Sequence, residues 1–254
     1  MLELVGIGKN YSVSGQRLAA LADIDLSFAP GSFTVIVGRS GCGKTTLLRI
    51  IAGLTSPDTG EIRNSGGARP RVSVVFQEPR LMPWLNVFDN IAFGLKGRLD
   101  RTSLEARVGA ILEVTGLAAF AGALPSQLSG GMAQRAALAR ALVMEPDLLL
   151  MDEPFAALDA FTRRSMQNEL VSLWQERKAT VVFVTHDVEE AVVLGQRVVE
   201  LSAGRVVGRE EVNLPYPRDP TGPGEAACRR SILTRLLSPA QAGPSTDSTQ
   251  ENQP

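Results

Sequence analysis

The sequence has few of the features that mark secreted, membrane-spanning or nucleic-acid-binding chains. Its 254 residues include two cysteines, Cys42 and Cys228, which are too few for a disulfide framework. No uncharged apolar run approaches the roughly 20 residues needed to cross a bilayer, and no basic N-terminal segment leads into an apolar signal core. The net charge of −1 gives no whole-chain attraction to nucleic acid. We therefore expect a cytoplasmic protein that binds no nucleic acid and reaches a membrane only through a partner.

What is present is the composition of a folded globular domain, with 44% hydrophobic and 21% charged residues. Alternating or continuous β-branched runs predict short strands, and apolar residues at helical spacing predict helices. Tyr11 is expected to lie between the first two strands. The expected strands cover residues 2–7, 26–28, 33–37, 71–76, 148–151, 180–185, 197–202 and 205–209, and the expected helices cover 46–52, 87–95, 103–115, 131–144, 160–177, 188–194 and 228–237.

The stretch from Gly38 to Thr45 reads GRSGCGKT and carries the clearest chemical signal. It lies between an expected strand and an expected helix, which is the setting that the phosphate-binding motif G-x-x-x-x-G-K-[ST] requires. Backbone N–H groups of such a loop and the start of the following helix can cradle the phosphates of ATP. An ordinary glycine-rich turn is the alternative. The expected nucleotide-binding residues of this segment are Gly38, Arg39, Ser40, Gly41, Cys42, Gly43, Lys44, Thr45 and Thr46.

Three side chains of this loop have separate predicted roles. Lys44 is expected to reach the β- and γ-phosphates during catalysis, and the Thr45 hydroxyl is expected to bind Mg²⁺. Cys42 lies in an electropositive loop at a helix start, where the pKa of a thiol is usually lowered. We therefore expect Cys42 to react with maleimides and to be protected by ATP.

Two adjacent carboxylates follow the apolar run at 148–151. An apolar strand that ends in two acids suits Mg²⁺-dependent phosphoryl transfer, in which one carboxylate holds the hydrated metal and the other orients or deprotonates the attacking water. Asp152 is predicted to serve the metal, and Glu153 is predicted to serve the water. The alternative is that the two acids simply end a strand at the surface.

A second candidate anion-binding segment is Leu128-Ser129-Gly130-Gly131, which leads into a helical pattern. A serine and two glycines ahead of a helix offer hydroxyl and backbone donors with no Cβ in the way. The upstream loop already accounts for the phosphates of one nucleotide, so a second such segment makes sense if it serves a nucleotide held by another subunit. A capped helix with a flexible lead-in is the alternative.

With these motifs in place, residues 2–210 resemble the ATP-binding subunit of ABC transporters, whose signature sequence is Leu-Ser-Gly-Gly followed by Gln or Met. The resemblance implies two cassettes packed head to tail. The phosphate loop of one copy would then face Ser129, Gly130 and Gly131 of the other across ATP.

The resemblance also gives roles to isolated residues. It implies that Gln77 contacts the Mg²⁺ and water region and that His186 touches the γ-phosphate. It further implies that Asp159 lies at the dimer interface and that Tyr11 stacks on adenine. Without the resemblance, a lone histidine after a strand is more often structural, and the tyrosine is equally well explained as a packed strand residue.

The implied fold class is α/β, with a P-loop NTPase core of the ABC ATPase type. This core has a RecA-like mixed sheet with flanking helices, an N-terminal antiparallel β-subdomain and an inserted helical subdomain. The expected ABC ATPase domain covers residues 1–215, with core segments 1–77 and 148–215 around a helical insertion at 78–147, and a C-terminal extension covers 216–254.

The C-terminal extension is expected to be less ordered than the domain before it. Residues 221–224 read Thr-Gly-Pro-Gly, which is typical of a linker. Residues 238–254 are rich in Pro, Ser, Gln and Thr with few large apolar residues, and this composition predicts disorder.

The loop at 76–84, together with the helical pattern at 87–95, resembles bacterial importers of the nitrate, sulfonate and taurine group. Leu81, Met82 and Trp84 lie in this proline-bounded loop, and apolar side chains of this kind often mark a protein contact when they are exposed. We expect the loop to meet a coupling helix of a membrane permease subunit. Packing inside the helical insertion is the alternative.

The resemblance implies a homodimeric, ATP-hydrolysing subunit of a bacterial ABC importer on the cytoplasmic face of the cell membrane. Its partners would be an integral membrane permease and, indirectly, a periplasmic or lipoprotein solute-binding protein. The solute would be a small anion such as nitrate, a sulfonate or taurine. The alternatives are a soluble ABC-type ATPase without a membrane partner and a P-loop kinase, which would leave the segment at 128–131 unexplained.

Overall fold

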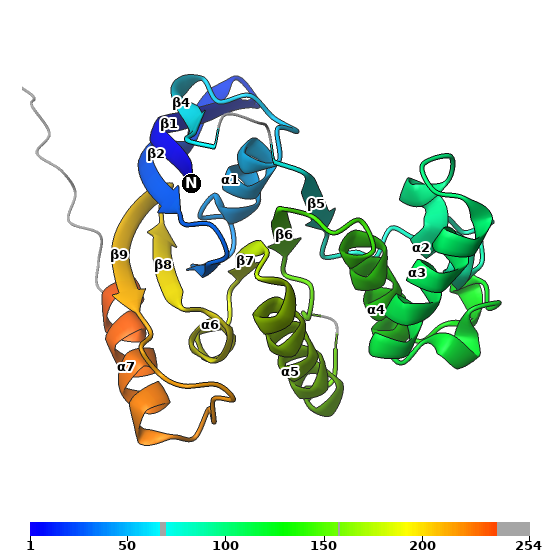
Figure 1. Cartoon of the computed structure of the whole chain (residues 1–254). Coiled ribbons are helices and arrows are strands. Elements are labelled where there is room, and N and C mark those ends of the chain that lie inside the picture. Colours follow the sequence, from blue (N-terminus) through cyan, green and yellow to red (C-terminus); the bar gives the residue numbers. More distant parts are fainter. Residues whose placement is uncertain (67–69, 157, 238–254) are drawn as a thin grey trace, which may run out of the picture.

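A computed structural model of the chain describes residues 1–66, 70–156 and 158–237, which form two β-sheets with helices around them (Figure 1). One is a small antiparallel sheet, and the other is a larger sheet with mostly parallel strands. The tail for which disorder is predicted, 238–254, lies outside the described residues. The architecture is of the predicted α/β type.

The small sheet has the strand order β2-β1-β4 and consists of β1 (Leu2–Val13), β2 (Gln16–Phe28) and β4 (Thr59–Asn64). Strands β1 and β2 form a long hairpin, whose turn residues Ser14 and Gly15 have φ angles of 51° and 79°. Positive φ at both positions is what a two-residue hairpin turn favours. The prediction of two short strands with Tyr11 between them is wrong, because Tyr11 lies within β1 opposite Leu18. Register shifts along the hairpin break the apolar alternation on which that prediction depended.

The main sheet has the strand order β5-β6-β7-β3-β8-β9, and its edge strand β9 runs antiparallel to β8. All residues of the central strand β3 are buried. A continuous buried run is expected of a parallel strand whose two faces are both covered. The strands are β3 (Phe33–Val37), β5 (Val72–Val75), β6 (Leu148–Asp152), β7 (Thr180–Thr185), β8 (Arg197–Ser202) and β9 (Arg205–Glu211).

Two apolar cores lie on opposite faces of the main sheet, because successive residues of a strand point to opposite faces. On one face, Ile36 packs with Leu47 of helix α1 (Lys44–Ile51) and with residues of the small sheet. On the other face, Phe33 packs edge-on against Trp174, with ring centroids 5.6 Å apart. The central strand is therefore fixed from both sides up to the point where the phosphate loop begins.

Helices α2, α3 and α4 lie between β5 and β6 in the sequence, and Figure 1 shows them gathered beside β5 at one end of the molecule. Side-chain oxygens of Asn86, Asp100 and Ser129 accept backbone N–H groups at the starts of these helices, as good N-caps do. No helix in the described part of the chain is long and apolar enough to cross a membrane. The helices are α2 (Val87–Ala92), α3 (Arg101–Val114), α4 (Gly130–Leu142), α5 (Ala160–Arg177) and α6 (Val188–Leu194), with 3-10 turns at Phe93–Leu95, Ala118–Phe120 and Pro125–Gln127.

The segment after residue 215 is more ordered than the sequence predicts. Helix α7 (Pro223–Leu237) begins inside the expected linker and packs on α6 and β9, with Ile232 fully buried. Pro223 suits the first turn of a helix, where its missing N–H costs no hydrogen bond. Arg235 pairs with the buried carboxylate of Glu200 on β8, and this pairing fixes the far end of the helix. These contacts join residues distant in sequence, so no local pattern predicted them.

Candidate nucleotide site

The predicted phosphate loop leaves the carboxyl end of β3 and enters α1, as the motif requires. Gly41 and Gly43 have φ angles of 79° and 105°, values that residues with a side chain rarely adopt. A Cβ on Gly43 would lie 2.4 Å from the carbonyl oxygen of Ala20, and a Cβ on Gly38 would lie 2.2 Å from that of Leu201. The close approach of the loop to β2 and β8 therefore requires glycine at these positions.

Lys44 is buried and points back into this loop. Its Nζ donates to the carbonyl oxygens of Gly38 and Arg39 at 2.8 and 3.0 Å, respectively. The same atom lies 3.8 Å from Oε1 of Glu153, which follows β6. The ammonium is thus fixed between the loop and a carboxylate, close to the helix start that favours an anion.

The hydroxyl of Thr45 donates to Oδ1 of Asp152 at 3.1 Å and so joins the start of α1 to the end of β6. Burial raises the pKa of Asp152, and the hydrogen bond from Thr45 offsets part of this effect. Hydroxyl and carboxylate oxygens suit Mg²⁺, which at phosphate sites usually takes few protein ligands and completes its shell with phosphate and water. The pair therefore fits a Mg²⁺ ion, whose charge would also offset the cost of burying the carboxylate.

Glu153 and His186 meet at the carboxyl ends of β6 and β7. Oε2 of Glu153 lies 2.9 Å from Nδ1 of His186. The N–H of Glu153 donates to the carbonyl oxygen of Val184 at 2.9 Å, and its φ of 44° is uncommon outside glycine. The side chain of Glu153 is 19% exposed, whereas that of His186 is 59% exposed. A carboxylate held in this way beside an accessible imidazole has the geometry of a general base with an orienting partner.

The structure therefore joins part of the predicted site into one cluster. Among the described residues, no hydrogen bond or ion pair links this cluster to Tyr11, Gln77 or Ser129. Tyr11 is exposed on β1, with Nζ of Lys9 5.8 Å from its ring centroid, and Gln77 is exposed just after β5. This cluster, called the catalytic cluster below after the role predicted for it, consists of Lys44, Thr45, Asp152, Glu153 and His186.

The predicted signature segment forms the exposed start of α4. The Oγ of Ser129 accepts the N–H of Met132 at 3.3 Å, which makes this serine the N-cap. Nothing lies within 4 Å of a Cβ built on Gly130, whereas a Cβ on Gly131 would lie 3.2 Å from the methyl carbon of Thr162. Ser129 and Gly130 are therefore open to a ligand, whereas Gly131 packs against α5.

Helix α4 also holds the loop that contains Gln77. Nε2 of Gln134 donates to the carbonyl oxygen of Phe76 at 3.3 Å, and the guanidinium of Arg140 donates to the carbonyls of residues 79–80 at 2.9 Å each. The same helix thus carries the exposed cap and fixes the backbone on both sides of the glutamine. Sequence reasoning missed this role of Gln134 and Arg140, because their partners are backbone carbonyls that no side-chain pattern reveals.

The prediction that the pKa of Cys42 is lowered is wrong. The thiol is buried, and a Cβ on Gly38 would lie only 2.7 Å from its Sγ. Burial raises the pKa of the Cys42 thiol, and the nearby Lys44 ammonium offsets this effect only in part. The side chain points beneath the loop, where loss of solvent outweighs the positive charge that the prediction considered.

The apolar loop before α2 is divided between the interior and the surface. Leu81 packs against the main core, whereas Trp84 is 75% exposed. The buried amide of Asn90 accepts the N–H of Met82 at 2.8 Å and donates to its carbonyl oxygen at 3.2 Å. Interior packing therefore explains Leu81, while the loop is fixed so that Trp84 is presented to solvent.

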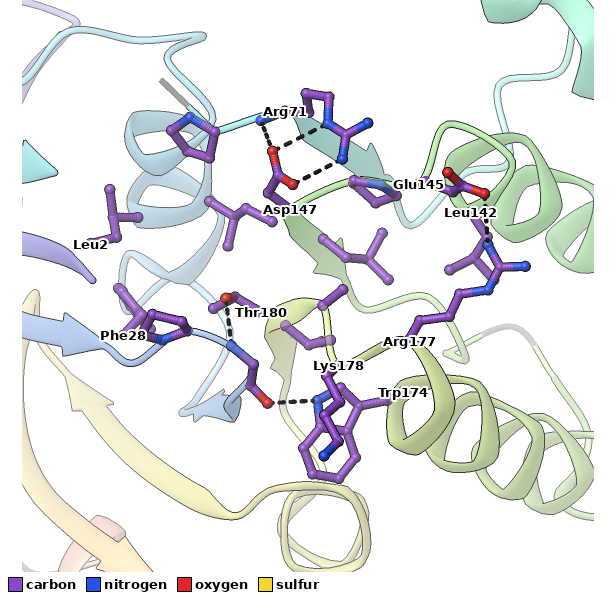
Figure 2. A pocket seen from close by; sticks show the side chains of 18 of the residues that line it. Leu2, Phe28, Arg71, Leu142, Glu145, Asp147, Trp174, Arg177, Lys178 and Thr180 are labelled. Atoms are coloured by element: carbon purple, nitrogen blue, oxygen red, sulfur yellow. Dashed lines mark hydrogen bonds and ion pairs between the residues drawn. The ribbon is translucent and has the colours of Figure 1, made fainter. Parts of the chain in front are cut away.

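A large cavity of about 640 Å³ lies at the amino ends of the parallel strands, and none of the predicted site residues lines it. Figure 2 shows its walls, which include Phe28 and Trp174, with the pair of Arg71 and Asp147 at one side. Asp147 and Thr180 stand at the amino ends of β6 and β7, whereas the catalytic cluster follows the carboxyl ends. The cavity is therefore separate from the candidate nucleotide site.

A mostly parallel sheet with a phosphate loop after its central strand and an acidic strand end beside it defines a P-loop NTPase. A family model described as ABC transporter matches residues 21–156. The chain therefore belongs to the ABC transporter family, in which it is an ATP-binding subunit with ATPase activity.

Relatives and solved structures agree with this assignment. The aliphatic sulfonates import ATP-binding protein of Granulibacter bethesdensis is 49% identical over 216 residues, which cover 85% of this chain and 87% of the relative. The protein of the same name from Bacillus subtilis is 42% identical over 234 residues, with coverage of 90% and 91%. The ATP-binding cassette MJ0796, in a dimeric post-hydrolysis state bound to ADP and Pi, has a TM-score of 0.76 at 32% identity and matches 85% of this chain and 100% of its own. The structure of cbiO1 from Clostridium perfringens, part of the ABC transporter complex cbiONQ, has a TM-score of 0.76 at 27% identity, with coverage of 92% and 95%. These neighbours confirm the predicted fold class.

Proposed function

We propose that the chain is the ATP-hydrolysing subunit of an ABC importer that takes up an aliphatic sulfonate or a similar small anion. The single observation that carries the hydrolytic role is the contact of 2.9 Å between Glu153 and His186 beside the phosphate loop. The names of relatives with 42–49% identity support import and the class of solute.

Each member of the catalytic cluster has a role in this proposal. The N–H groups of the loop bind the phosphates, and Lys44 neutralises their charge. Thr45 and Asp152 hold Mg²⁺, which when bound stabilises negative charge on the phosphate oxygens. Glu153 accepts the proton of the attacking water, while His186 orients this carboxylate and contacts the γ-phosphate.

The remaining predicted residues act when two copies meet. The exposed Ser129, with Gly130 and Gly131, binds the γ-phosphate of the nucleotide held by the second copy. Gln77 completes the region around Mg²⁺ and water, and Tyr11 stacks on adenine. The dimeric state of a similar cassette supports this arrangement.

We assign the coupling contact to the loop that presents Trp84. An exposed indole in a fixed loop is an effective anchor for a protein partner, and a membrane permease helix is the partner that an import system supplies. The cassette would then work at the cytoplasmic face of the membrane, with a solute-binding protein outside. The core segments 1–77 and 148–215 would bind the nucleotide, and the insertion at 78–147 would receive the permease.

The test is uptake of a radiolabelled short-chain alkanesulfonate by cells that carry either the wild-type gene or the Glu153→Gln variant. We expect uptake with the wild type and none with the variant, although both proteins are found in the membrane fraction with the permease. Sulfonate uptake that continues without the gene would contradict the solute class. ATPase activity without membrane association would favour a soluble ABC-type ATPase.

A further inference from the structure

The buried carboxylate of Glu190 lies close to the pair formed by Glu153 and His186, and none of the roles proposed above uses it. Glu190 on α6 is 5% exposed. Its Oε1 accepts Nε2 of Gln167 on α5 at 3.2 Å. Glu190 and Thr185 line one small cavity, and the Thr185 hydroxyl offsets part of the rise in the pKa of Glu190 that burial causes. The charged groups that face it are the carboxylate of Asp187 and the guanidinium of Arg163. A buried carboxyl group is costly unless it is hydrogen-bonded, so these partners define where it sits.

Thr185 connects this carboxylate to the catalytic imidazole. Its Oγ accepts the N–H of Asp187 at 3.0 Å, which closes a tight turn with His186 at the apex. A hydroxyl has one proton to donate and lone pairs with which to accept. When that proton is directed at Glu190, the lone pairs remain for the N–H of the turn. Fixing this hydroxyl therefore fixes the turn that carries the imidazole.

The helix that carries Glu190 is anchored to the same turn. Oδ1 of Asp187 accepts the N–H groups of Glu189 and Glu190 at 2.8 and 3.3 Å, so that Asp187 is the N-cap of α6. Glu190 thus shares a cavity with Thr185 and makes a backbone contact with Asp187, the two residues that flank His186. It is therefore placed to influence the direction of the imidazole.

A small cavity of about 40 Å³ lies between this network and the catalytic pair. Its walls include Glu153, His186, Arg163 and Glu190. The Nε of Arg163 is buried and has no hydrogen-bond partner within the described part of the chain. The cavity has room for at least one ordered water, with polar groups to bind it. Glu190 therefore reaches the reacting groups through the turn and through this polar cavity.

We propose that Glu190 is a positioning residue for ATP hydrolysis, which acts through Thr185 to place His186 against Glu153 and takes no part in ATP binding. The inference rests on the proposed function, because it assigns a turnover role to the same site. A residue of this kind changes kcat and leaves the KM for ATP unchanged.

The experiment compares the purified full-length variants Thr185→Val, Thr185→Ser and Glu190→Gln with wild type. Valine keeps the shape of threonine without the hydroxyl. Glutamine keeps the shape of glutamate but has one acceptor oxygen in place of two, no negative charge and an NH₂ group that only donates. Thr185→Val removes every hydrogen bond of the Thr185 hydroxyl, including the one that it accepts from the N–H of Asp187, and Glu190→Gln removes the negative charge of the carboxylate. We expect kcat to fall roughly tenfold in both variants, with the KM for ATP within about twofold. Thr185→Ser restores the hydroxyl and should retain most of the activity. The exposed neighbour Glu189, changed to Gln, is the matched control and should behave as wild type.

Wild-type kcat in both Thr185→Val and Glu190→Gln would overturn the proposal. A loss in Thr185→Ser as large as in Thr185→Val would do the same, and so would a parallel loss of ATP affinity, because each indicates a structural role only. If Thr185→Val does not fold, the isosteric Glu190→Gln decides the question. The proposed function has its own control: equal hydrolysis by wild type and Glu153→Gln would refute that function, whereas an inactive Glu153→Gln beside a normal Glu190→Gln would refute only the positioning role.

Discussion

The two helix starts that suit phosphate binding are built differently. At α1, Lys44 and Thr45 contact carbonyl and carboxylate oxygens from their own chain, so the reacting end of one nucleotide site is nearly complete within one copy. At α4, Ser129 is exposed, and the helix makes its contacts with the loop around Gln77 instead of the catalytic cluster. Under the proposed function, a single chain organises the first of these half-sites and presents the second to another copy.

The largest expected effect is that of Glu153→Gln, in the half of the nucleotide site that is nearly complete within one chain. Glu153→Gln removes the proton acceptor but keeps the size of the side chain, and we expect hydrolysis to fall by about 10²–10⁴-fold, as for loss of a general base. Because the phosphate loop is untouched, ATP binding should persist and the dimer should accumulate. ATPase assays and size-exclusion chromatography with ATP check both parts. Unchanged turnover would mean that another group acts as the base.

Lys44→Ala should have the next largest effect. The ammonium contacts the loop carbonyls and faces Glu153, and its loss should lower kcat/KM by roughly 10–100-fold, as expected for a hydrogen bond to a charged group. In contrast to Glu153→Gln, this variant should also bind ATP more weakly. Fluorescent nucleotide titration measures the difference, and wild-type affinity together with wild-type hydrolysis would remove Lys44 from the site.

Ser129→Ala tests the exposed half. We expect kcat to fall about tenfold, because one donor to the second nucleotide is lost, while ATP binding to the monomer stays normal. The substitution also removes an N-cap, which costs about 1 kcal/mol of stability. Asp100→Ala removes the cap of α3, away from the site, and is therefore the matched control. If the two variants lose stability and activity to the same extent, the serine is a cap and nothing more.

The smallest expected effect concerns Cys42, which is a buried residue of the phosphate loop. Cys42 is buried with a raised pKa, so less of it is thiolate at pH 8 than in a free thiol. Burial raises the pKa of Cys228 as well, so the difference in exposure decides the comparison. Maleimide labelling of the buried Cys42 should be several-fold slower than that of the half-buried Cys228, and it should increase as the pH rises toward the raised pKa of the thiol. Mass spectrometry of labelled peptides follows the two sites. Rapid labelling of Cys42 near neutral pH would contradict the buried position.

The parts of the fold that were predicted correctly are those in which local pattern and final environment agree. The bounds of α5, α6 and β7 match the predicted ranges, because their caps and apolar periods lie within the segments themselves. Asp152 and Glu153 were predicted to lie together at the end of an apolar strand, and β6 ends at Asp152 as expected. The long hairpin of β1 and β2 was missed, since its bulges and polar residues hide the strand period.

The rest of the site depends on contacts that a sequence does not display. Arg140 and Gln134 hold the loop of Gln77 through backbone carbonyls, and Thr185 lines the same cavity as Glu190 only because β7 and α6 fold back on each other. Cys42 is buried because its side chain packs against Gly38 of the same loop. A count of nearby charges does not predict this packing.

The most direct test of the two-half-site account is a structure of the Glu153→Gln variant trapped with ATP and Mg²⁺. The account predicts a dimer in which Oγ of Ser129 from one copy lies about 3 Å from the γ-phosphate bound by the phosphate loop of the other copy. A nucleotide-bound dimer in which Ser129 lies far from both triphosphates would contradict it.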